Sequence, residues 1–178
     1  LVERGKITYD TPIADVWPEF AQNGKEKMLL RHALNHTSGL ANVPLDCTDY
    51  AKLCDYDFMC ALLAAQAPAT EPGTVREYHA LTYGWLMGEI ARRVDGRTIS
   101  QLIQDEVCTP LGIKDMYVGI PDKVESRIAT LLEEVPEPAP NQITPQSVPC
   151  RMHPLYLSTN SHDLRRACTP AANGMMRA

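Results

Sequence analysis

Apolar residues recur at helical spacing in four stretches of this 178-residue chain. The stretches are 25–36, 48–66, about 80–94 and 98–109, and each has its apolar positions three or four residues apart. Between them lie turn-rich segments, and we find no internal repeat. The pattern predicts that most of the regular structure in this chain is helical.

Glycines and a threonine mark the expected ends of these helices. Gly5 follows an apolar pair and is typical of the residue after a helix, so 1–4 reads as a last helical turn. Gly39 is expected to take a left-handed cap after the helix at 25–36, and Thr98 to cap the fourth helix. Gly84 and Gly88, four residues apart, predict a seam where another backbone comes close.

The stretch 130–150 is rich in proline and acidic residues and shows no periodicity, so we expect a long loop or an insertion there. The chain also starts in the pattern of a helix end and stops without a cap. We therefore expect residues 1–178 to form one partial domain, truncated at both ends.

Composition narrows the class of partner. A formal charge of −5 argues against nucleic acid and against an anionic membrane surface, and no apolar run is long enough to span a bilayer. The 6 cysteines form no C-x-x-C pair and match neither a zinc site nor a disulfide scaffold. Reduced thiols are favoured, which points to the cytoplasm, although the compartment stays open at this point.

Two histidines and a serine have spacings that invite comparison with known catalytic patterns. His32 and His36 have the spacing of two zinc ligands on a helix, but Ala33 stands where a metalloprotease has glutamate, and we predict no metal. Ser38 lies in "NHTSGL", not in a nucleophile elbow, so a catalytic triad on it is disfavoured. Glycine-rich phosphate loops are absent from the sequence, and we predict no cofactor.

Tyr78 is the strongest candidate for chemistry. It follows the turn at Pro72-Gly73 and stands at the entry to the helix at 80–94. The residues alone leave two alternatives open, a core aromatic at a helix start or a phenol at a reaction centre.

The order of three segments resembles the serine β-lactamase and penicillin-binding-protein superfamily, closest to family VIII carboxylesterases and β-lactamase-domain proteins. The segments are "LVERGKITYDTPIADVWPEF", "RHALNHTSGL" and "PGTVREYHALTYGWLMGEIARRVDGRTISQLIQDEVCTPLGIKDMYVG". The resemblance implies an α/β fold of the β-lactamase/DD-peptidase type. This chain would hold mostly its helical region and lack much of the central sheet.

The resemblance also implies acyl transfer through a serine ester, with the serine in Ser-x-x-Lys and Tyr78 as the tyrosine that shares the proton with that lysine. No Ser-x-x-Lys occurs in these residues, so the nucleophile would lie outside them. His79 is a candidate substrate-binding residue or a surface residue, and Ala80 replaces an asparagine of the penicillin-recognising branches. A small-molecule ester is the expected substrate; the alternative is a catalytically inactive binding or scaffold domain.

Overall fold

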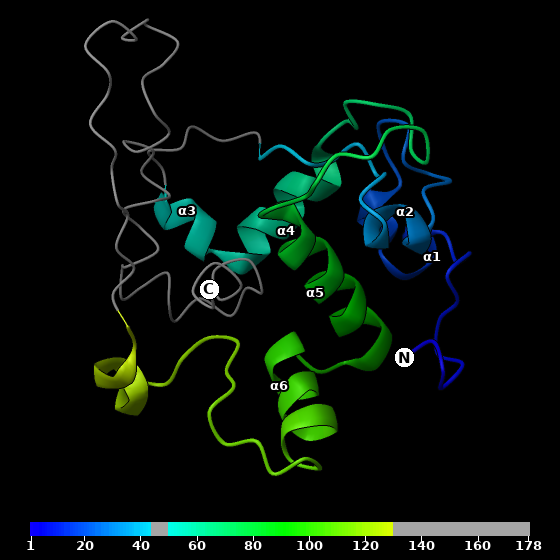
Figure 1. Cartoon of the computed structure of the whole chain (residues 1–178). Helices are drawn as coiled ribbons and strands as arrows, with labels where there is room; N and C mark the ends of the chain where they lie inside the picture. The colour runs from blue at the N-terminus through cyan, green and yellow to red at the C-terminus, as the bar shows by residue number, and fades with distance from the viewer. Residues whose placement is uncertain (44–49, 130–178) are drawn as a thin grey trace, which may run out of the picture.

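The computed structural model describes residues 1–43 and 50–129, and within these ranges the regular structure is helical (Figure 1). Pro12 and Leu29 form an isolated antiparallel bridge, the only β pairing within these ranges. The predicted insertion at 130–150 lies outside the described residues. The α-helices are α1 Ile13–Val16, α2 Leu30–Leu34, α3 Tyr50–Cys54, α4 Tyr56–Ala65, α5 Thr82–Asp95 and α6 Ile99–Ile103. Pro18–Phe20 and Asp122–Arg127 are 3₁₀ helices, and Gln104–Cys108 is a π-helix.

Helix α5 is the centre of the described fold. It contacts α1, α2, α4 and α6, and Figure 1 shows it running between them. The predicted helix at 80–94 is confirmed to within two residues, because its apolar stripe is buried and Gly96 ends it in a left-handed conformation with φ 88°. Its buried positions include Trp85, Leu86 and Ile90.

The stretch at 48–66 does not form the single helix that its apolar spacing predicts. It contains α3 and α4, and Asp55 separates them. The Asp55 carboxylate accepts a hydrogen bond of 3.0 Å from the Phe58 amide, which makes Asp55 the N-cap of α4. A local side-chain cap therefore outweighs the continuous apolar pattern.

The helix predicted at 25–36 is correct in type but too long. Only α2 is helical, because the preceding residues are held by tertiary contacts. The buried Lys25 ammonium donates to the carbonyls of Gln22 and Gln66, and Leu29 pairs with Pro12. These contacts hold residues 25–29 in a non-helical conformation.

The predictions at Gly5 and Thr98 agree more closely with the structure. The Gly5 amide bonds to the Val2 carbonyl at 2.9 Å and the Lys6 amide to the Leu1 carbonyl at 3.2 Å, the pair of bonds that closes a helix at a glycine. Residues 1–4 are turns, so this closure is present without a helix before it. Thr98 caps α6 as predicted, in a reciprocal capping box with Gln101.

At Gly88, one of the two glycines of the predicted seam, a side chain comes close instead of a backbone. A Cβ added at Gly88 would lie 2.7 Å from the Tyr56 hydroxyl oxygen, so glycine makes room for α4. The expectation of a close backbone is wrong at Gly88, although the need for a small residue there is correct.

A single apolar cluster joins the N-terminal segment to α4 and α5. Trp17 and Phe20 stack at 5.1 Å between ring centroids, and the Arg93 guanidinium lies over the Trp17 ring. Fully buried members of the cluster include Ile13, Phe20, Met28, Leu40, Met59, Leu63 and Leu86.

Cys54, Cys60 and Cys108 form no disulfide among the described residues. Within those residues no helix combines the length and apolarity needed to cross a bilayer.

Candidate functional site

Tyr78 lies in the turn that precedes α5, four residues before its first helical residue, Thr82. Its side chain is 75% exposed, so the phenol projects into solvent instead of joining the core. The alternative of a core aromatic is therefore wrong for these residues. Its catalytic role stays a prediction.

The backbone on either side of Tyr78 is held by the segment that follows α2. The Glu77 amide donates to the His36 carbonyl at 2.9 Å, and the His79 amide donates to His36 Nδ1 at 3.4 Å. Earlier in the same loop, the Gly73 amide donates to the Thr37 carbonyl at 2.8 Å. Two loops far apart in sequence thus fix the peptide that carries the phenol.

The imidazole of His36 lies against three aromatic rings. Its centroid is 5.1 Å from Tyr78 in an edge-on arrangement, 5.0 Å from Tyr83 and 5.3 Å from His79. His36 also has φ of 66°, which a residue with a side chain adopts only where surrounding contacts hold it. His36, and not Gly39 alone, takes the left-handed conformation after α2.

His79 is 1% exposed, so the surface alternative does not describe it. Its Nε2 lies 2.5 Å from the Ser38 hydroxyl, and its Nδ1 lies 2.6 Å from the Glu77 carbonyl oxygen. Burial lowers the pKa of His79 and the nearby His36 acts in the same direction, while the Glu77 carbonyl opposes them. A neutral ring therefore fits this environment, and its contact with substrate stays a prediction.

Ser38 is fully buried, and its oxygen also accepts from the Leu40 amide at 3.2 Å. The structure gives it a histidine partner, as a triad would require, but Nδ1 of that histidine is bonded to a backbone carbonyl instead of a carboxylate. With no access to solvent and both a donor and an acceptor contact inside the protein, this serine has the environment of a structural hydroxyl.

The two histidines with zinc-ligand spacing do not converge. His32 Nδ1 accepts from the Leu29 amide at 3.3 Å, while His36 Nδ1 accepts from His79 on the other side of the loop. Burial, with Arg31 nearby, lowers the pKa of His32. Within residues 1–43 and 50–129 no three histidine, cysteine or acidic side chains are grouped as metal ligands.

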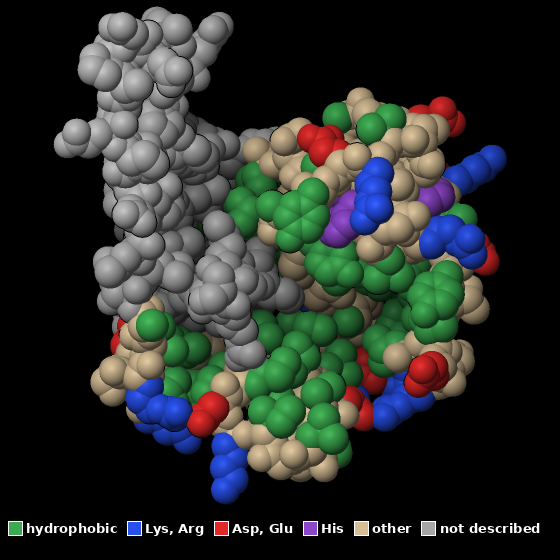
Figure 2. Space-filling view, in the orientation of Figure 1, with side chains coloured by type: hydrophobic (Ala, Val, Ile, Leu, Met, Phe, Trp, Pro, Cys, Tyr) green, Lys and Arg blue, Asp and Glu red, His purple; other side chains and the backbone are tan. Residues whose placement is uncertain are grey.

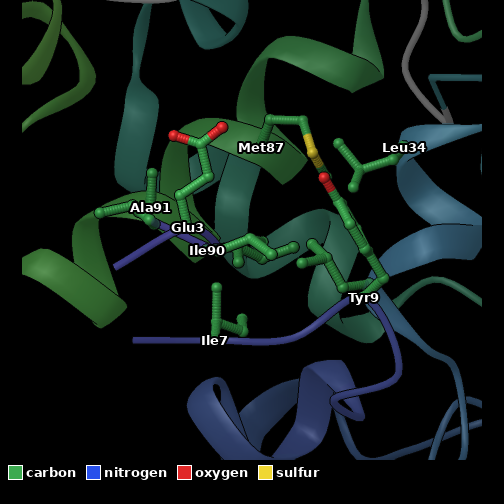
Figure 3. A pocket seen from close by; sticks show the side chains of 10 residues that line it. Glu3, Ile7, Tyr9, Leu34, Met87, Ile90 and Ala91 are labelled. Carbon is green, nitrogen blue, oxygen red and sulfur yellow. The ribbon is translucent and has the colours of Figure 1, made fainter. Parts of the chain in front are cut away.

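A hollow of about 350 Å³ lies elsewhere, between the N-terminal segment, α2 and α5. Figure 3 shows Ile7, Tyr9, Leu34, Met87 and Ile90 around it. Figure 2 shows hydrophobic side chains gathered across this face of the molecule, with histidine side chains in its upper part. Tyr78 and His79 are not among the residues that line this hollow, so it is separate from the phenol.

The sequence predicts Tyr78 and His79 as site residues but does not indicate which residues hold them. The Ser38–His79 and His36–His79 contacts join positions 41 and 43 apart, and no local spacing in the chain indicates them. The block "HTSGL" contributes to the family resemblance, but it gives no geometry.

Solved structures of similar fold place the chain in the β-lactamase/penicillin-binding-protein fold class. The chain belongs to the Beta-lactamase family, whose sequence profile matches residues 1–178. The expected fold class is thereby confirmed.

Similar proteins carry esterase, β-lactamase and penicillin-binding names. Esterase/beta-lactamase LipL of Mycobacterium tuberculosis is 35% identical over 133 residues, which is 74% of this chain and 30% of that protein. A penicillin-binding protein homolog from Caulobacter crescentus is 41% identical with a TM-score of 0.77, covering 94% of this chain and 44% of its own. A family VIII carboxylesterase is 40% identical with a TM-score of 0.71, covering 74% and 36%. The chain thus spans less than half the length of these relatives.

Proposed function

We propose that this chain supplies the tyrosine-bearing part of a serine hydrolase site that transfers acyl groups from carboxylic esters. The observation that carries the proposal is Tyr78, whose phenol is 75% exposed while the peptide on both sides is hydrogen-bonded to His36. A reacting group needs this combination of an accessible oxygen and a fixed backbone.

The chemistry needs a nucleophile from outside residues 1–178, since no serine in them has a lysine three positions later. A serine and lysine one helical turn apart would face the Tyr78 oxygen together. The phenol and the lysine would take the serine proton as the serine oxygen attacks the ester carbonyl, and would return it to the departing alcohol. Water then releases the acid from the acyl-serine by the same proton path.

Esters are favoured over lactams because of the residue two positions after the tyrosine. Ala80 has only a methyl group and offers no hydrogen bond to the amide of a lactam side chain. The carboxylesterase relative at 40% identity supports the same choice.

The first test uses the chain extended to the length of its relatives, treated with p-nitrophenyl butyrate. We expect intact-mass spectrometry to detect one acyl adduct, formed at least about 100-fold more slowly in Tyr78→Phe because the proton acceptor is lost. Tyr83→Phe is the matched control, since that ring also packs on His36, and it is expected to acylate at the full rate. No adduct, or an undiminished rate in Tyr78→Phe, would contradict the proposal.

A catalytically inactive binding or scaffold domain is the alternative. Sequence upstream of Leu1 separates the two. A Ser-x-x-Lys there supports the hydrolase, and a natural protein without one supports the scaffold.

A further inference from the structure

Ser38 and His79 form a buried pair that the chemistry above does not use. The Ser38 oxygen and His79 Nε2 are 2.5 Å apart, and neither residue is more than 1% exposed. The Glu77 carbonyl can only accept, so His79 Nδ1 must carry the proton that it receives at 2.6 Å. His79 Nε2 then accepts the proton of the Ser38 hydroxyl.

This arrangement gives a directed chain of hydrogen bonds through the site. The Leu40 amide donates to Ser38, Ser38 donates to His79, and His79 donates to the Glu77 carbonyl. The chain ends on the residue before Tyr78 and passes through the residue after it. The phenol is therefore carried by a tripeptide whose two flanking residues are tied to each other and to the loop at Ser38.

We propose that Ser38 and His79 are a positioning pair that sets the direction of the Tyr78 phenol through the peptide between Glu77 and His79. The proposal rests on the catalytic role proposed for Tyr78. Neither member reaches solvent, so the pair would act on the reaction only through the tyrosine.

His36 supplies the second half of the support. It accepts from the His79 amide, it accepts from the Glu77 amide through its carbonyl, and its ring packs on the edge of Tyr78. Its φ of 66° has to be maintained by these contacts. Releasing His79 from Ser38 would therefore loosen both the peptide and the ring against which the phenol rests.

The test is a double-mutant cycle in the chain extended to the length of its relatives, with single-turnover acylation by p-nitrophenyl butyrate as the readout. We expect Ser38→Ala to slow acylation about tenfold with little change in KM, because a displaced phenol affects the reaction more than substrate binding. In a Tyr78→Phe background the same substitution should cause no further loss. Ser38→Thr keeps the hydroxyl and is expected to restore most of the rate.

Thr82→Val is the matched control for stability. Thr82 is also fully buried, and its hydroxyl donates to the Leu40 carbonyl at 2.7 Å, so the variant removes a bond of the same loop without touching His79. We expect a comparable fall in Tm with an unchanged acylation rate. Should Ser38→Ala not fold, His79→Asn replaces it in the cycle, because its amide can still meet Glu77 but is too short for Ser38.

The outcomes distinguish failure of the proposed positioning pair from failure of the proposed hydrolase function. Three results would overturn the positioning pair and leave the hydrolase proposal standing. They are full-rate acylation in Ser38→Ala, an equal loss of acylation rate from Ser38→Ala with tyrosine and with phenylalanine at position 78, and an equal slowing of acylation in Thr82→Val. Full-rate acylation in Tyr78→Phe would overturn the hydrolase proposal, and the inference with it.

Discussion

At the scale of single residues, the loop after α2 depends on two left-handed positions for different reasons. His36 holds φ of 66° through its contacts with the segment at 77–79. Gly39 has φ of 74°, and a Cβ added there would lie 2.5 Å from the Thr70 carbonyl oxygen. Glycine at this place is predictable from the sequence as a helix cap, but the close approach of the Thr70 backbone is not.

Gly39→Ala should therefore destabilise the protein more than its backbone angle alone explains. Gly96→Ala is the matched control, because Gly96 has φ of 88° and nothing within 4 Å of an added Cβ. We expect Gly96→Ala to lower the free energy of unfolding by about 1 kcal/mol, and Gly39→Ala by a further ~1–3 kcal/mol from overpacking. Urea unfolding of both variants measures the difference, and equal losses would contradict the close approach.

At the scale of elements, local signals predicted the helix ends that depend on neighbouring residues. Thr98 with Gln101, and the glycine after α5, act within one turn, and the structure contains both. The stretches at 25–36 and 48–66 were predicted too long, because their limits depend on Lys25 binding the carbonyl of Gln66 and on a cap inside an apolar run. Periodicity does not carry that information.

The cap of α4 gives a direct prediction at this scale. Asp55→Ala removes the oxygen that accepts from the Phe58 amide, and we expect the free energy of unfolding to fall by about 1 kcal/mol. Asp55→Asn keeps an accepting oxygen in the same place and should lose much less. Thermal unfolding followed by circular dichroism compares the two; an asparagine variant as unstable as the alanine variant would assign the effect to charge instead of capping.

At the scale of the whole molecule, the candidate site is formed by segments that are far apart in the sequence. Resemblance predicts a role for Tyr78, but the neighbouring residue His79 is held by Ser38 and His36, some forty residues earlier in the chain. Charge also acts across long sequence distances, since Arg4 and Arg97 both bind the carboxylate of Glu106. These pairings arise from packing around α5, and only a three-dimensional structure reveals them.

Two histidines, one buried and one partly buried, and an ion-paired glutamate predict how the stability of the protein depends on pH. Burial lowers the pKa of His79 and of His32 below the usual 6.5. The unfolded chain therefore takes up protons that the folded chain resists, and the free energy of unfolding should fall as pH drops below about 6.5. Hydrogen bonds from Arg4 and then Arg97 lower the pKa of Glu106 from 4.5 to about 2, so a second loss should begin below about pH 4.5.

Urea midpoints measured from pH 8 to pH 3 should thus be level above pH 7, decline through pH 6 and decline further below pH 4.5. His32→Asn keeps an acceptor for the Leu29 amide but cannot titrate, so it should reduce the first decline and leave the second unchanged. Midpoints that stay level from pH 7 to pH 5 would mean that burial lowers the pKa of neither ring. His79 would then gain a proton below about pH 6.5 and could no longer accept from the Ser38 hydroxyl there, so the hydrogen-bond chain from Ser38 through His79 to Glu77 would hold only at higher pH.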